Sequence, residues 1–74
     1  MESKEQIKAH FARHLQKLLR EQKLSLRGLA TSSGLEYSQV QRIANGKVNL
    51  ALTTIYASAK GLNVPVDKLL TGID

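Results

Sequence analysis

The segment from residue 36 to residue 45 gathers hydrogen-bonding side chains on the side of a short helix that we expect to be exposed. These side chains are Tyr37, Ser38, Gln39, Gln41 and Arg42. An arginine can hold guanine O6 and N7 through two N–H groups, and a glutamine can pair with adenine N6 and N7 in the same manner. Tyr37 could lie against a thymine methyl group or donate to a phosphate. These residue types therefore predict a surface that contacts the edges of base pairs.

Each of these side chains also has an ordinary structural interpretation. Ser38, Gln39, Gln41 and Arg42 could simply face solvent, as most polar residues do. Tyr37 could pack on the preceding helix instead of reaching outward. The residue types alone leave both interpretations open.

Other chemistry finds little support. His10 and His14 are four residues apart and could hold a divalent ion, but no third ligand is assured nearby, so a partly packed histidine pair is the simpler interpretation. The six carboxylates are scattered, cysteine is absent, and no Gly-rich phosphate loop is present. We therefore expect no catalytic residues, no metal site, no cofactor and no enzymatic activity.

Length and composition predict one small domain. The 74 residues leave room for a single core, which we place within residues 5–70 of a domain spanning 1–74. Hydrophobic residues make up 42% of the chain and aromatic residues only 4%, so aliphatic side chains must form this core. Without cysteine, no disulfide can brace it.

The net charge favours a polyanionic partner, and the hydropathy of the chain favours a cytoplasmic location. The net charge of +5 comes from eleven Lys and Arg against six Asp and Glu. Neutralising phosphates with such residues releases counterions, although a basic surface alone does not prove nucleic-acid binding. No apolar run reaches the roughly 18 residues that a membrane span needs. The polar start of the chain is unlike a signal peptide, so we expect a cytoplasmic protein with no membrane partner.

Hydrophobic spacing predicts two helices in the first half of the chain. The first carries an apolar stripe of Ile7, Phe11, Leu15, Leu18 and Leu19. Its opposite side holds Arg13, Lys17 and Arg20, which could be a solvated helix back. Ser25 is a good N-cap for a short second helix that buries Leu26, Leu29 and Ala30. We interpret Gly28 as a point where another helix comes close, and Gly34 as the left-handed end of the second helix.

Three more helices are predicted downstream. The first of them runs from about Glu36 to Asn45, buries Val40, Ile43 and Ala44, and is closed by Gly46. The next carries an apolar stripe of Leu52, Ile55, Tyr56, Ala59 and Leu62. Pro65 suits the beginning of a last helical turn or two.

Residues 25 to 46 resemble the helix-turn-helix of the phage repressor and Cro-like family, also called the XRE family. The match consists of Ser25, Leu29-Ala30, Gly34-Leu35, Val40, Ile43 and Asn45-Gly46, at the intervals of the family. Downstream, the match continues through Leu52-Thr53-Thr54-Ile55, Ala59, Leu62 and Leu69-Leu70. The resemblance implies an all-α, compact five-helix bundle that binds double-stranded DNA as a small transcriptional regulator, with a repressor favoured.

The resemblance also implies roles for single residues. Tyr37, Ser38 and Arg42 match positions that touch base edges in this family, and Gln39 and Gln41 flank them. Asn45, at the C-terminal end of the third helix, matches a position that often contacts the sugar-phosphate backbone, and Lys47 and Asn49 in the following loop could do likewise. Ser25 and Arg27, at the start of the second helix, are the other phosphate-contacting candidates. The third helix would then enter the major groove while the second lies across the backbone.

The chain departs from the family in two places. Leu26 stands where many members have a glutamine that reaches a phosphate, so only the backbone N–H groups of the helix end remain for that contact. Leu19 and Ala44 stand where many members have an Arg–Glu pair. Both partners are absent together, which leads us to expect an apolar contact in place of the ion pair.

One such domain reads only a few base pairs, so we expect a homodimer on a pseudo-palindromic operator. The expected dimer surface is apolar and C-terminal, consisting of Leu62, Val64, Val66, Leu69, Leu70 and Ile73. The alternative is that these residues merely complete the monomer core.

The rival function is a protein-interaction module, such as an antitoxin that covers a toxin. A phage-type repressor, a controller protein of a restriction-modification system and an antitoxin all remain open.

Overall fold

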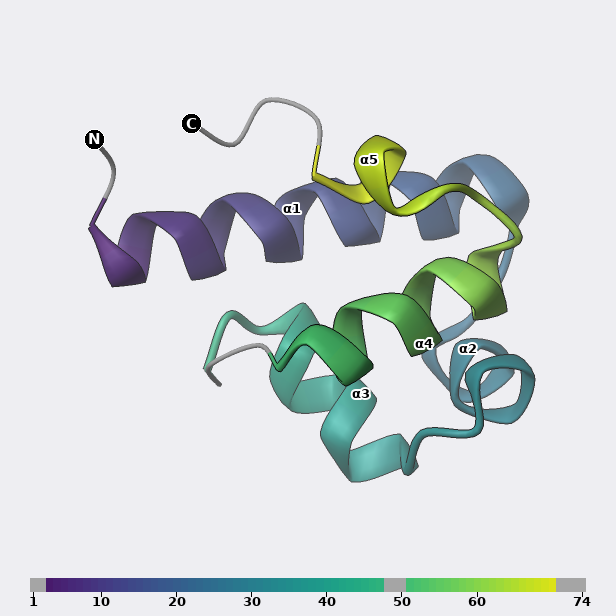
Figure 1. The fold of residues 1–74 in the computed structure, drawn as a ribbon. Coiled ribbons are helices and arrows are strands. Elements are labelled where there is room, and N and C mark those ends of the chain that lie inside the picture. Colours follow the sequence, from purple (N-terminus) through teal and green to yellow (C-terminus); the bar gives the residue numbers. More distant parts are fainter. Residues whose placement is uncertain (1–2, 48–50, 71–74) are drawn as a thin grey trace.

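The computed structural model describes residues 3–47 and 51–70, and within them the chain forms helices and no strand. The elements are α1 (Lys4–Gln22), α2 (Leu26–Ser33), α3 (Tyr37–Ala44), α4 (Leu52–Leu62) and α5 (Val66–Leu69). Figure 1 shows α1 along one side of the molecule with α5 against it, α4 in the middle, and α2 and α3 on the other side. The predicted all-α, five-helix architecture is confirmed.

Local sequence explains where the first two helices begin. At α1, the backbone N–H of Gln6 donates to Ser3 Oγ (3.2 Å), and the backbone N–H of Ser3 donates to Gln6 Oε1 (2.8 Å). This reciprocal capping satisfies N–H groups that a helix end otherwise leaves unpaired. At α2, Ser25 Oγ accepts from the backbone N–H of Gly28 (2.9 Å), as predicted for this N-cap.

The core lies between α1 on one side and α2, α3 and α4 on the other. Its buried members include Phe11, Leu15, Leu18, Leu19, Leu29, Ala30, Val40, Ile43, Ala59, Leu62 and Leu69. Leu62 and Leu69 are completely enclosed within the single chain. The expected dimer surface was wrong at these two positions, because a side chain that fills the monomer core has no area left to offer a partner. Val64, Val66 and Leu70 are partly buried and pack against the same core, and Ile73 lies outside the described residues.

The close approach between helices occurs at Gly61, not at Gly28. A Cβ atom on Gly61 would come within 2.9 Å of Ser33 Cβ and 3.0 Å of Leu29 Cδ1, both on α2. A Cβ on Gly28 would instead meet the side chain of Leu24, in the adjoining turn, at 2.7 Å. The expectation for Gly28 was therefore wrong, and the missing side chain at Gly61 is what lets α4 lie directly on α2.

The buried side of α4 coincides only in part with the predicted stripe: Ala59 and Leu62 are buried and Ile55 packs against the core, as expected. Thr54 and Ser58 are buried, whereas Leu52 is 68% exposed and Tyr56 58% exposed. The hydroxyl of Ser58 donates to the carbonyl of Thr54 (2.9 Å), so this polar group is buried with its hydrogen bond made. Two members of the predicted stripe, Leu52 and Tyr56, therefore lie at the surface.

One contact fastens α5 to α1. His14 Nε2 lies 2.8 Å from the carbonyl oxygen of Lys68, a hydrogen bond between residues far apart in the sequence. This bond gives His14 a structural role. Within residues 3–47 and 51–70, no group of three potential metal ligands comes together, and no helix is long and apolar enough to cross a membrane.

Candidate DNA interface

The turn between α2 and α3 is built around Gly34. Its backbone is left-handed (φ 79°), and its N–H donates to the carbonyl of Ala30 (3.0 Å), ending α2 as the sequence predicts. One residue later, the backbone N–H of Leu35 donates to Ser33 Oγ (3.2 Å). The turn thus consists of three residues, Gly34, Leu35 and Glu36, and α3 begins at Tyr37.

The two sides of α3 differ sharply in burial. Val40, Ile43 and Ala44 are buried on one side. Ser38, Gln41 and Arg42 are exposed on the other. An α-helix with its side chains is about 10–12 Å across, so it fits the major groove, which is about 12 Å wide. The exposed side of α3 therefore has both the shape and the chemistry to face base pairs.

A shallow hollow of about 310 Å³ opens along this exposed side. Glu36, Ser38, Gln39 and Arg42 line it. Ser38 and Arg42 lie four residues apart, so they occupy the same face one turn from each other. Both are exposed site residues, so the structure brings them together on open surface.

Tyr37 and Arg27 form a pair across the turn. The guanidinium carbon of Arg27 lies 4.1 Å from the centre of the Tyr37 ring. Tyr37 is half-buried and packs against the core, whereas Arg27 is exposed. Tyr37 thus packs on α2, the alternative considered above, and the guanidinium of Arg27 lies over its ring. The sequence marked both residues but gave no sign of their contact.

Gln39 is turned toward α4. It is half-buried, and its Nε2 lies 3.4 Å from the hydroxyl of Thr54. This long hydrogen bond links the first half of α3 to the first half of α4. The amide nitrogen of Gln39 is thereby directed into the protein.

The candidate phosphate contacts surround α3. Asn45 follows it directly as the C-cap, and Lys47 comes two residues later; both are exposed. Ser25 is exposed at the start of α2, where its Oγ already accepts one hydrogen bond. Asn49 lies outside the described residues. The described candidates therefore border both ends of the helix-turn-helix.

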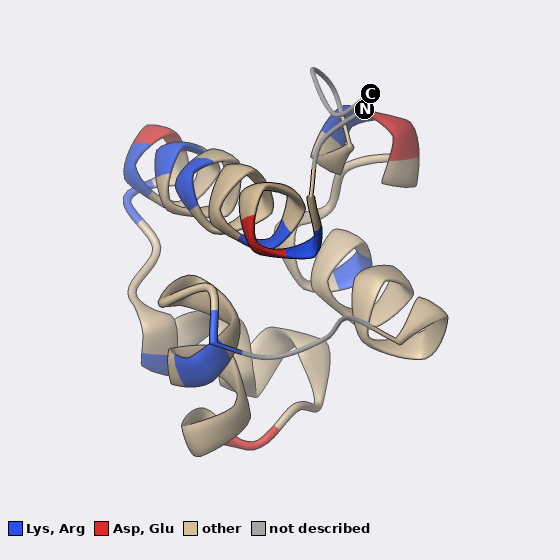
Figure 2. Cartoon of the chain, turned by 90° about the vertical axis from the view of Figure 1, so that its left-hand side faces the viewer, with Lys and Arg blue, Asp and Glu red and all other residues tan. Residues whose placement is uncertain are grey.

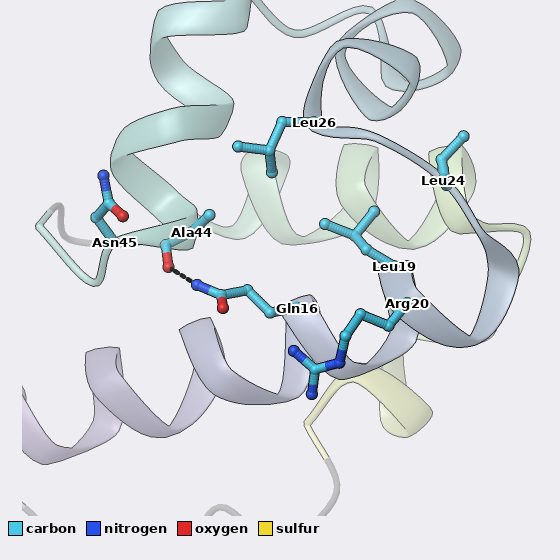
Figure 3. A pocket seen from close by; sticks show the side chains of 7 residues that line it. All are labelled: Gln16, Leu19, Arg20, Leu24, Leu26, Ala44 and Asn45. Carbon is cyan, nitrogen blue, oxygen red and sulfur yellow. Dashed lines mark hydrogen bonds between the residues drawn. The ribbon is translucent and has the colours of Figure 1, made fainter.

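A pocket of about 330 Å³ lies where α1, α2 and α3 meet (Figure 3). Its lining consists of Gln16, Leu19, Arg20, Leu24, Leu26, Ala44 and Asn45. Leu19 and Ala44 are both buried here, in keeping with apolar residues at the positions of the family's ion pair. Gln16 Nε2 donates to the carbonyl oxygen of Ala44 (2.6 Å), which fixes the end of α3 to α1. Sequence reasoning missed Gln16, although a polar residue beside the apolar stripe of α1 was a signal.

Lys and Arg residues occur along α1 and again on α2 and α3 (Figure 2). On α1, Arg13, Lys17 and Arg20 are exposed, as expected for the back of this helix. On the helix-turn-helix, Arg27 and Arg42 provide the positive charge, and Lys47 follows α3. A polyanion lying against α2 and α3 would therefore meet cations close to both helices.

Comparison with known proteins settles the family. The profile of the helix-turn-helix family HTH_3 matches residues 15–69, most of the chain. The chain belongs to this helix-turn-helix family. The family consists of DNA-binding transcription regulators of the XRE type and is not a class of enzymes. Among curated proteins, none matches the chain.

Two solved structures resemble this helix-turn-helix protein. The restriction-modification controller protein C.AhdI from Aeromonas hydrophila is 31% identical, with a TM-score of 0.80, over 84% of this chain and 94% of that one. An HTH_3 family transcriptional regulator from Vibrio cholerae is 21% identical, with a TM-score of 0.89, over 96% of this chain. The match covers only 40% of the Vibrio cholerae chain, and at this identity it shows the fold alone.

Proposed function

We propose that this helix-turn-helix protein binds a specific double-stranded DNA sequence as a homodimer and represses transcription there. The observation that carries the proposal is the division of α3 into a buried apolar side and an open polar side. Ser38, Gln41 and Arg42 project from the open side. A recognition helix needs this division, because its base-reading side chains must reach past the protein body into the groove.

The side chains of α3 divide into readers and supports. Arg42 is the strongest candidate reader, since its guanidinium can bind guanine at two points, and Gln41 can pair with adenine. Ser38, on the same face as Arg42, can donate or accept. Tyr37 and Gln39 have partners within the protein, so we assign them supporting roles: Tyr37 positions Arg27, and Gln39 holds α3 to α4.

Phosphate contacts would fix the domain on the duplex without reading sequence. Arg27 is exposed while its guanidinium lies over the ring of Tyr37, so its N–H groups are available to a phosphate. Asn45 and Lys47 lie beyond the other end of α3. With Ser25 at the start of α2, these groups can contact the backbone on both sides of the groove that α3 would occupy.

The rival function, a module or antitoxin that binds protein through α3, fits the surface less well. Protein-binding surfaces are anchored by aromatic and apolar side chains. The exposed side of α3 carries polar groups, and the exposed apolar side chains Leu52 and Tyr56 lie on α4. A protein partner would therefore be expected on α4, leaving α3 free for DNA.

Selection of bound sites from random double-stranded DNA tests the proposal. We expect a pseudo-palindrome whose half-sites lie about one helical turn apart. Titration of the recovered site at two salt concentrations should show weaker binding at higher salt, because counterions are released on binding. If no sequence is enriched and the affinity for DNA does not change with salt concentration, DNA binding is refuted.

A further inference from the structure

The outer face of α4 is the most apolar open surface among the described residues. Leu52 and Tyr56 are the two large hydrophobic residues exposed in the described part of the chain. They are four residues apart, so they share one face of the helix. We call this pair the α4 face. A Leu and a Tyr left in solvent form the kind of anchor that protein interfaces bury.

The charge of the chain indicates what can cover this face. The twelve residues between Lys47 and Lys60 include no Lys, Arg, Asp or Glu, although the whole chain carries a net charge of +5. Within α4 the only charged residue is Lys60, in its last turn, and the helix is otherwise tan in Figure 2. Two copies of a basic protein repel each other over most of their surfaces. At the α4 face they can meet without placing like charges together.

We propose that the α4 face binds the α4 face of a second copy of this chain. The inference rests on the proposed function, since reading a palindrome requires two copies related by a two-fold axis. In such a dimer each copy contributes the same patch, so a self-complementary, uncharged surface is what the symmetry demands. The second copy takes the place of solvent over Leu52 and Tyr56.

The C-terminal region does not provide an equivalent surface. Leu62 and Leu69 are buried in the core. Three further apolar residues are already partly buried against it: Val64, Val66 and Leu70. The α4 face, in contrast, is mostly open in the single chain. It also belongs to the helix that Gln39 links to α3, so pairing through α4 sets the positions of the two recognition helices.

The dimer is expected to be weak. One face of an 11-residue helix is small beside the roughly 800 Å² that each partner buries in a standard interface. Its population should therefore depend on protein concentration in the micromolar range or above, and binding at two adjacent half-sites should stabilise it.

Sedimentation equilibrium without DNA measures this association. We expect the wild type to dimerise reversibly, and Tyr56→Ser or Leu52→Gln to raise the dimer Kd by about tenfold or more. Both side chains are exposed in the single chain, so thermal unfolding followed by circular dichroism should show that the variants keep the fold. Val66→Thr, a nearly isosteric change in the C-terminal region, is the matched control and should leave the dimer Kd unchanged.

Two results would overturn the α4 dimer. One is a wild type that stays monomeric up to about 1 mM, which would leave the face to a different protein. The other is a dimer that Val66→Thr weakens while Tyr56→Ser does not.

Binding to DNA with a single half-site separates this inference from the proposed function. The α4 variants should bind one half-site as the wild type does and lose only the cooperative gain on the full palindrome. A wild type that dimerises through α4 but binds no DNA would refute the function and keep the interface. A protein that binds the half-site but does not dimerise through α4 would refute the proposed interface and leave DNA binding supported.

Discussion

The guanidinium carbon of Arg27, in the first turn of α2, lies 4.1 Å from the centre of the Tyr37 ring, in the first turn of α3. The pair joins the two helices of the helix-turn-helix at the side where both begin. The guanidinium lies over the ring, and Arg27 is exposed to solvent. In the proposed contact with a phosphate, a guanidinium held by this ring has less rotamer freedom left to lose on binding.

Replacing Tyr37 should affect DNA binding through Arg27. Tyr37→Leu removes the aromatic face, and we expect a loss of about 0.5–1 kcal/mol in affinity for any DNA sequence, the usual size of an exposed cation–π contact. Tyr37→Phe keeps the ring and should bind as the wild type does. Fluorescence anisotropy titration of both variants measures this. A loss in the phenylalanine variant equal to that in the leucine variant would show that the hydroxyl, rather than the stacking, matters.

Arg42 should determine preference at one base pair. Arg42→Ala should lower affinity for the selected site by about 1–3 kcal/mol, because two hydrogen bonds to one guanine are lost. Competition with sites substituted at each position should show that the variant no longer discriminates at a single position. If affinity and base preference both stayed as in the wild type, Arg42 would not be a reader.

Lys47 should act on all sequences alike. Lys47→Ala removes one phosphate contact, so binding should weaken to a similar extent on every sequence, and the salt slope should fall by about one unit. Lys68→Ala makes the same change of charge on α5, which lies away from α3 in Figures 1 and 2. Titration of both variants over a range of salt concentrations makes the comparison. Equal effects of the two substitutions would mean that only net charge is being measured.

Gln16 should stabilise the fold by holding the end of α3. Gln16→Ala leaves the partly buried carbonyl of Ala44 without its donor, and we expect a loss of about 1–3 kcal/mol in the free energy of unfolding. Gln41→Ala removes the same side chain from an exposed position of α3 and should change stability by less than about 0.5 kcal/mol. Urea unfolding measures both. Similar values for the two variants would show that the bond to Ala44 contributes nothing.

The two helical glycines Gly61 and Gly28 should respond differently to alanine. Gly61→Ala forces a Cβ against Ser33 and Leu29 of α2, and overpacking of this kind costs about 1–3 kcal/mol. Gly28→Ala meets the end of the Leu24 side chain, which can move, while the helix gains up to about 1 kcal/mol from losing a glycine. Thermal unfolding should therefore show Gly61→Ala as clearly the less stable variant. The reverse order would contradict the close contact between α2 and α4.

Sequence reasoning succeeded where a property depends on neighbours along the chain. Ser25 caps α2 and Gly34 ends it, because both roles are set by local backbone geometry. The polar side of α3 was also predictable, since three apolar residues in a short helix leave only one way to bury them.

Sequence reasoning failed for features that depend on contacts between helices. The apolar stripe of α4 was broad enough to bury either of its edges, and the contact with α2 at Gly61 decides which edge faces the core. Thr54 and Ser58 lie on the buried edge, where both hydroxyls have hydrogen-bond partners. Gln16 donates to a carbonyl 28 residues away, and although its place beside the apolar stripe of α1 is a local signal, no local pattern identifies its partner. The stacking of Arg27 on Tyr37 likewise depends on the angle between two helices.

The recognition helix is tied down at both ends by different neighbours. Gln16 on α1 holds its last residue, and Thr54 on α4 holds Gln39 near its first. A helix fastened in this way cannot swivel against its scaffold, so two copies joined through α4 would present their reading surfaces at one set separation and angle. Each base pair added between half-sites rotates one of them by about 35° around the duplex axis. If the protein does not adjust, the DNA must twist to bring the second half-site back into position. We therefore expect a changed spacer length to lower the binding affinity as much as a changed base does.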